Sequence, residues 1–216
     1  MRPEDAARVV IETITQMAAE GRPLMQRILP QDDIHWWAHY PEDDARDAVT
    51  RSRYYYHVHE PGDRNPDEHG HFHLFLHRRQ MDRGAIPIAE PAEGEKAPAL
   101  MVHIAGLSID HRGIPIAWFT TNRWVTDEFM YPATTLAAHL DRYNVDSCGE
   151  DPLVNRFLTA MVALYRDELS ELLAARDARL AEIGAGPAAE ELFESGNDVL
   201  STLSIDLDAK VASLDL

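Results

Sequence analysis

The chain has 216 residues, of which 45% are apolar and 26% are charged, and its formal net charge is -17. This composition is typical of a globular protein, and the length suggests one domain with a sizeable core. The strongly acidic balance argues against nucleic acids and anionic membranes as partners, because both bind basic surfaces.

The N-terminal segment, residues 1–50, is predicted to begin with a helix. Residues 3–20 carry apolar side chains at helical spacing, after a proline and two acidic residues that suit a first helical turn. The rest of the segment is polar and acidic apart from a short aromatic stretch. We expect its adjacent tryptophans, Trp36 and Trp37, to cover the hydrophobic core.

The period of the apolar pattern changes to two between residues 53 and 121, which predicts an antiparallel sheet of about four strands. The predicted strands are residues 53–59, 69–78, 100–110 and 114–121. A tight hairpin that ends at Gly113 joins the last two strands, with the glycine where a positive φ is needed. The third strand is apolar at odd and even positions, so we expect it at the centre of the sheet.

Residues 132–183 are predicted to be helical, with a short helix over 132–143 and a long helix that begins at Asp151. The tail, residues 192–216, mixes apolar and acidic residues and could add an edge strand or lie across a partner. Helices are therefore expected before and after the sheet. The predicted fold class is α+β, in a single domain over residues 1–216.

Six of the eleven histidines fall between residues 57 and 77, a window of about a tenth of the chain, and all six have odd numbers. They are His57, His59, His69, His71, His73 and His77. Alternate residues of a strand share one face, so each predicted strand presents its histidines together. The two sets converge on one patch if His59 pairs with His69 or His71, and they lie on opposite faces if the register is odd.

Neutral imidazole is the commonest protein ligand for zinc and also binds iron, so convergent histidines predict a site for one of these divalent ions. The candidate ligands are His57, His59, His69, His71 and His73. His103 becomes a further candidate if the third strand lies beside the cluster. Glu68 is the candidate catalytic residue, because a carboxylate at the rim could act as general base on a metal-bound water or add an oxygen ligand.

Two functions fit such a site. In the first, the protein is a metal-dependent enzyme that acts on a small molecule, where zinc implies hydrolysis through an activated water and iron implies oxidative chemistry. In the second, it is a non-catalytic protein that stores, delivers or senses a metal ion or a small ligand. A metal-free polar pocket for an organic ligand, or a merely solvated face, would also accommodate alternating histidines.

Residues 69–75 read His-Gly-His-Phe-His-Leu-Phe, which resembles the signature of the histidine-triad nucleotide hydrolases and transferases. Gly70 stands where that family has an apolar residue. The resemblance implies that the middle histidine, His71, attacks an α-phosphate and forms a covalent nucleotidyl intermediate. Nucleotide hydrolysis or transfer is therefore a second alternative function.

Three further stretches are distinctive: Tyr-Tyr-Tyr-His-Val-His at 54–59, residues 68–76, and Thr-Thr-Asn-Arg-Trp-Val-Thr-Asp-Glu at 120–128. They are similar to an uncharacterised bacterial family of domains of unknown function. The resemblance spans residues 36–210 and implies a self-contained domain. That family has no activity that could be transferred to this chain.

The remaining expectations concern location and partners. No secretory signal is visible at the start of the chain, and no apolar run approaches the roughly 18 residues that cross a bilayer. Cys148 is the single cysteine, which excludes an intrachain disulfide. We therefore expect a cytoplasmic protein whose partner is a small molecule, and the long helix and tail suggest a homodimer.

Overall fold

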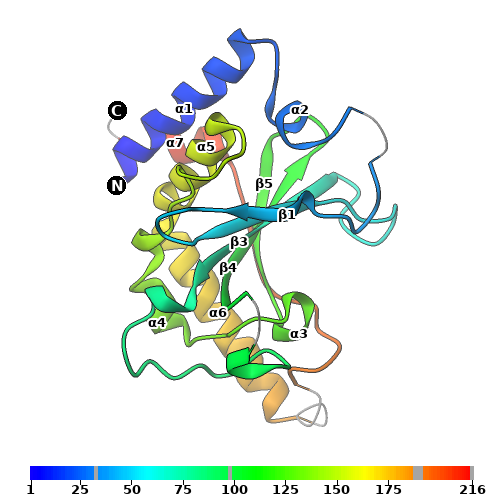
Figure 1. Cartoon of the computed structure of the whole chain (residues 1–216), viewed down its shortest axis with the longest axis vertical. Coiled ribbons are helices and arrows are strands. Elements are labelled where there is room, and N and C mark those ends of the chain that lie inside the picture. Colours follow the sequence, from blue (N-terminus) through cyan, green and yellow to red (C-terminus); the bar gives the residue numbers. More distant parts are fainter. Residues whose placement is uncertain (32–33, 97–98, 187–191, 215–216) are drawn as a thin grey trace.

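A computed structural model describes residues 1–31, 34–96, 99–186 and 192–214. At its centre lies one antiparallel sheet of six strands, in which neighbouring strands are also consecutive in the sequence (Figure 1). Helices precede and follow the sheet, so the predicted α+β fold class is confirmed. The sheet has six strands where about four were expected.

The strands are β1 (Tyr40–Arg46), β2 (Arg53–His57), β3 (Glu68–His77), β4 (Met101–Asp110), β5 (Pro115–Thr121) and β6 (Val199–Ser204). The four inner strands, β2 to β5, are the four that the alternating pattern predicts. The hairpin between β4 and β5 also forms as expected, with Gly113 at φ 84°.

The two additional strands, β1 and β6, lie at the edges of the sheet. β1 reads Tyr-Pro-Glu-Asp-Asp-Ala-Arg and shows no apolar alternation, which hides it from a periodicity argument. An edge strand tolerates proline and charge because one of its sides needs no strand partner. β6 pairs with β5, so the tail does add an edge strand, and it continues into α7 (Leu207–Ala212). Residues 215–216 of the predicted tail lie outside the described residues.

The longer helices are α1 (Pro3–Ala19), α5 (Pro152–Leu164) and α6 (Arg166–Gly184), and the shorter ones are α2 (Leu24–Ile28), α3 (Arg123–Thr126) and α4 (Ala133–Ala137). The single long helix expected from Asp151 is thus two helices. The backbone leaves the helical conformation at Tyr165 (φ -102°, ψ 21°), where the buried ring packs against Trp118 of β5. Within the described ranges, no helix is both long and apolar enough to cross a membrane.

The two faces of β3 carry different chemistry. Its even residues Phe72, Leu74 and Leu76 are buried in the main hydrophobic core, together with side chains of α1, α5 and α6. Figure 1 shows α1, α5 and α7 grouped at one end of the molecule. The odd residues His71 and His73 are equally buried on the other face. Helices therefore close the core face, and the histidine face is left to α3 and the connecting segments.

The expectation that Trp36 and Trp37 cover the hydrophobic core is wrong. These two residues are 53% and 52% exposed. The Trp37 ring instead meets the ring of His59 edge-on, with 4.2 Å between the ring centroids. An indole suits such a place because it combines apolar area with a polar N–H. Trp37 therefore covers part of the histidine face and not the core.

Candidate metal centre

The histidines of β2 and β3 meet because His57 pairs directly with His71 across the two strands. Nε2 of His71 lies 2.6 Å from Nε2 of His57 and 3.1 Å from Nε2 of His73. His59 follows the end of β2 and places its Nε2 3.2 Å from that of His57. The ligand atoms of His57, His71 and His73 all lie within 4.8 Å of one another, so these three side chains could hold one metal ion.

A bulge at the start of β3 changes which side chains reach this face. Between Glu68 and Gly70, β3 advances by two residues while β4 advances by one. Such a bulge shifts the alternation of side chains by one position. Glu68 consequently reaches the histidine face, whereas Nδ1 of His69 lies 2.8 Å from the hydroxyl oxygen of Tyr56. Tyr56 belongs to the core face, so the structure does not bring His69 to the cluster.

A second bulge, in β4, brings His103 to the cluster. Phe75 of β3 pairs with His103, although regular pairing would place Ile104 opposite Phe75. The extra residue turns His103 away from the core and toward the histidine face. Nε2 of His103 then lies 3.0 Å from Nδ1 of His73. His103 therefore contacts this candidate ligand on the side of the ring away from the other Nε2 atoms.

Carboxylates hold the outer nitrogens of two of the clustered histidines. Nδ1 of His71 donates to Oε1 of Glu68 at 2.7 Å, and Nδ1 of His59 donates to Oδ2 of Asp63 at 3.1 Å. Metal-binding histidines typically donate their second N–H to such a partner, which orients the ring and raises its basicity. Glu68 and Asp63 therefore occupy the positions of supporting groups.

A chain of hydrogen bonds holds the third histidine. Nδ1 of His73 lies 3.0 Å from Nε2 of His103, and Nδ1 of His103 lies 3.1 Å from Oγ1 of Thr121. All three side chains are buried. This chain orients the His73 ring through Nδ1 and leaves its Nε2 pointing at the cluster.

Burial keeps the imidazoles neutral at pH 7. Desolvation lowers the pKa of His57 to about 3 and that of His103 to about 3. The same cause, with the nearby cationic groups, holds the pKa of His71 and His73 well below the ordinary value. Neutral imidazole is the form that binds metal ions, so no proton has to be displaced from these rings at pH 7.

The rings bring their Nε2 atoms together at the centre. A carboxylate only accepts hydrogen bonds, so the proton of His71 lies on Nδ1 and its Nε2 carries a lone pair. His73 can carry its proton on either nitrogen, because both of its partners, Nε2 of His103 and Nε2 of His71, are imidazole nitrogens. Without an ion, Nε2 of His57 or of His73 can donate to the lone pair of His71. A cation at the centre would replace these shared protons, and the Nε2 lone pairs would then coordinate it.

The spacing of the nitrogens fits such a cation. Zinc–nitrogen bonds of about 2.0–2.1 Å set tetrahedral nitrogens about 3.3 Å apart. The Nε2 contacts of 3.1 and 3.2 Å are slightly shorter than this separation, and the 2.6 Å contact between His57 and His71 is clearly shorter. Small ring movements would therefore suffice to complete a coordination sphere.

A cavity of about 560 Å³ opens over the cluster, a size that suits a small organic molecule. Its described lining includes five histidines, four other aromatic residues and three charged residues, namely His39, His57, His59, His71, His73, Trp37, Tyr55, Phe119, Trp124, Arg64, Asp63 and Asp198. Glu68 is not among the described residues that line this cavity. Its carboxylate pairs with Nδ1 of His71 and borders a neighbouring cavity together with Arg64 and Phe119, and its role as general base stays a prediction.

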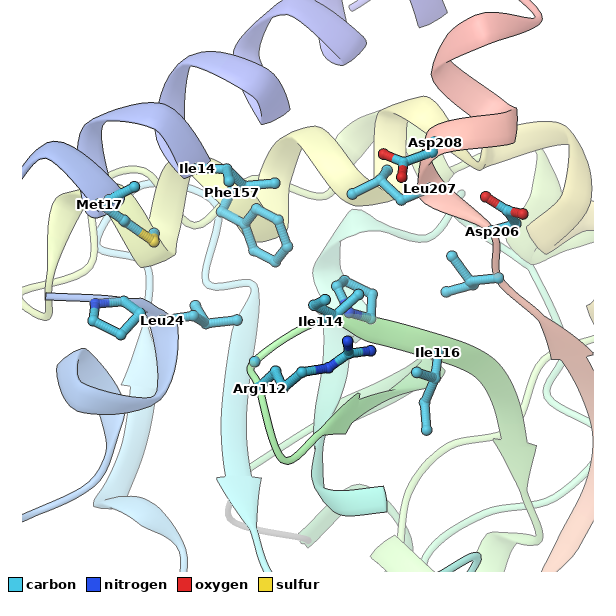
Figure 2. A pocket seen from close by; sticks show the side chains of 15 residues that line it. Ile14, Met17, Leu24, Arg112, Ile114, Ile116, Phe157, Asp206, Leu207 and Asp208 are labelled. Carbon is cyan, nitrogen blue, oxygen red and sulfur yellow. The ribbon is translucent and has the colours of Figure 1, made fainter. Parts of the chain in front are cut away.

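A second cavity, of about 610 Å³, lies between α1, the β4–β5 hairpin, α5 and the start of α7. Figure 2 shows Ile14, Met17 and Phe157 among the side chains that line it. No described histidine borders this cavity, and Arg112 at its edge already pairs with Asp110, with 3.0 Å between Nε and Oδ2. The convergent polar groups that mark a reactive site are therefore over the sheet and not in this groove.

Sequence reasoning missed Asp63, Arg64 and Thr121. Asp63 and Arg64 lie in a connector rich in turn residues, where acidic side chains look alike until the loop is folded. Thr121 ends a strand and carries no pattern of its own. His77, the sixth member of the odd-numbered set, accepts a hydrogen bond from the backbone N–H two residues later and stays outside the cluster.

Comparison with known proteins supports the longer of the two resemblances. No curated protein and no solved structure matches the chain. The likeness to the histidine-triad proteins stays a prediction, whereas a family model covers almost the whole chain. The chain belongs to the family described as a domain of unknown function, DUF6969, whose model matches residues 4–205.

Proposed function

We propose that this protein binds a divalent metal ion through Nε2 of His57, His71 and His73, with His59 as a further ligand at the mouth of the site. One observation carries the proposal: the imidazoles converge through Nε2, with His57, His71 and His73 buried, while hydrogen-bond partners hold Nδ1 of His71, His73 and His59. This pattern is typical of histidines that are oriented for a metal ion.

We further propose that the ion acts on a small molecule in the cavity above it. Zinc held by His57, His71 and His73 alone keeps one position open for water, and would support hydrolysis, whereas His59 as a fourth ligand would fill that position. Iron held by histidines keeps positions open for substrate and oxygen, and would support oxidative chemistry. The cavity of about 560 Å³ next to the nitrogens supports an enzyme more than a closed structural site.

Nucleotidyl transfer by His71 has less support. Its Nε2, the atom that would attack phosphorus, has the Nε2 atoms of His57 and His73 at 2.6 and 3.1 Å. An α-phosphate would need the space that these rings fill.

The metal proposal is tested by elemental analysis of protein purified without a polyhistidine tag, in parallel aerobic and anaerobic preparations. We expect close to one zinc or iron ion per chain in the wild type, and loss of the ion in the double variant His71→Ala, His73→Ala. His111→Ala is the matched control, because that histidine is exposed on the hairpin. Equal metal content in the double variant and the control would contradict the proposal.

A cobalt-substituted protein separates the enzyme from the storage protein. An open coordination position binds azide, which changes the visible spectrum of the cobalt ion. We expect such a change in the wild type if the centre is catalytic. A spectrum that azide leaves unaltered would mean that protein ligands saturate the ion, and would favour the non-catalytic function.

A further inference from the structure

Arg64 lines the wall of the cavity, and part of its guanidinium group makes no hydrogen bond to the described residues. Its Cζ lies 4.5 Å from the centroid of the Phe119 ring, and its Nε lies 3.5 Å from Oε1 of Glu68. The side chain is 22% exposed. Among the described residues, none forms a hydrogen bond with its two terminal nitrogens. The stacking and the ion pair thus hold the group in place and leave two of its nitrogens available to a ligand.

The same cavity connects Arg64 with the histidine nitrogens. Arg64, His71 and His73 all line it, so one small molecule can reach the guanidinium and the metal position together. A guanidinium presents a planar fork of N–H donors that matches the two oxygens of a carboxylate. Arg64 is therefore suited to hold the carboxylate of a ligand whose other end faces the ion.

The remaining walls restrict the rest of the ligand. Trp37, Phe119 and Trp124 give the cavity aromatic surface, which suits a flat ring. Asp63 and Asp198 line it too, and a second anionic group would be repelled by them. The lining thus favours a ligand with one negative charge.

We propose that the cavity binds a small aromatic monocarboxylate, with its carboxylate on Arg64, its ring against the aromatic walls and its reacting group toward the metal ion. This inference rests on the proposed function, because the ion defines the reacting end of the cavity. Arg64 is then the residue that selects the substrate.

The test is a calorimetric titration of zinc-loaded protein with benzoate, phenylacetate and cinnamate, and with benzamide as the uncharged counterpart of benzoate. We expect at least one of the acids to bind, and Arg64→Gln to weaken that binding by about tenfold or more, since a charge-assisted pair is lost. We also expect benzoate to bind more tightly than benzamide. Arg83→Gln is the matched control, because Arg83 is exposed and does not line the cavity.

Two results would overturn the inference. One is that none of the three acids binds at millimolar concentration. The other is that an acid binds equally well to Arg64→Gln, which would mean that its carboxylate sits on the ion. Zinc content is measured in every sample. Either result, obtained on protein that holds stoichiometric zinc, would contradict this inference but not the proposed metal centre. Absence of zinc from the wild type would instead remove the proposed function, and this inference with it.

Discussion

His71 makes contacts on every side of its ring. Its Nδ1 donates to Glu68, its Nε2 faces His57 and His73, and its ring meets Phe119 edge-on with 4.8 Å between centroids. The residue is 1% exposed. A side chain held in this way keeps one rotamer, which lowers the entropy lost when an ion binds.

Glu68→Gln should weaken metal binding without abolishing it. The substitution keeps the shape of the side chain but removes the charge that supports Nδ1 of His71. Loss of such a partner typically reduces metal affinity about 10- to 100-fold. Competition with a chromogenic chelator measures the change. Glu60→Gln, at an exposed site in the loop that precedes β3, should keep the wild-type affinity, and equal affinities in both variants would contradict the assigned role of Glu68.

The stability of the metal-free protein should fall as the pH is lowered from about 7.5 to about 5.5. Burial lowers the pKa of His57 and of His103 to about 3, whereas histidine in the unfolded chain titrates near 6.5. Between these values the unfolded state binds more protons, so stability is lost as the pH falls below about 6.5.

Each histidine whose pKa is lowered by burial should contribute about 1 kcal/mol to this loss of stability at about pH 5.5. Urea unfolding at the two pH values, in the presence of a chelator, measures the difference in the free energy of unfolding. A free energy of unfolding that stays constant between about pH 7.5 and about pH 5.5 would show that the rings are not buried in their neutral form.

At the scale of the elements, two bulges decide which side chains share the site. Alternation along a regular strand correctly groups His71 with His73, and the strand register, which the sequence left open, places His57 on the same face. Alternation fails at His69, which an extra residue in β3 sends to the opposite face. His103 arrives by the reverse effect in β4. Gly70 marks the first bulge in the sequence, since a glycine inside a strand often accompanies one, but the position and direction of a bulge depend on pairing between two distant strands.

Gly106→Ala should destabilise the sheet beneath the cavity. Gly106 pairs with His73 on β3 and with Phe119 on β5, and an added Cβ would lie 2.1 Å from Cζ of the Phe119 ring. The ring would have to move against its neighbours, at a cost of about 1–3 kcal/mol.

Urea unfolding of the wild type and of Gly106→Ala at pH 7 measures this loss of unfolding free energy. Gly149→Ala is the control, because no atom lies within 4 Å of the added Cβ there. That variant should match or slightly exceed the wild type. If Gly106→Ala were as stable as Gly149→Ala, this result would contradict the close contact between the Phe119 ring and the backbone of β4.

At the scale of the whole molecule, composition and periodicity predict the fold class and the four inner strands. The edge strands were harder to predict. β1 is acidic and contains Pro41, and β6 lies in a tail whose apolar residues suit a strand or an arm equally well. Edge strands are stabilised from one side only, so their sequences carry less of the alternating pattern. The break between α5 and α6 at Tyr165 depends on packing against β5, which the local sequence does not predict.

The homodimer remains a prediction at this scale. If α6 and the tail meet a second copy, the chain should elute from size exclusion with the mass of two chains by light scattering. The mass of one chain, at concentrations up to about 100-fold above those of a typical assay, would contradict the dimer.

The central claim is that imidazole nitrogens on the sheet hold a metal ion. X-ray absorption at the metal edge tests it most directly, on protein loaded with one equivalent of zinc. The account predicts three or four nitrogen neighbours at about 2.0–2.1 Å. It also predicts outer-shell scattering typical of imidazole, and the loss of this scattering in the double variant His71→Ala, His73→Ala. A first shell of oxygen atoms without imidazole scattering would contradict the claim, because the ion would then lie elsewhere on the acidic surface.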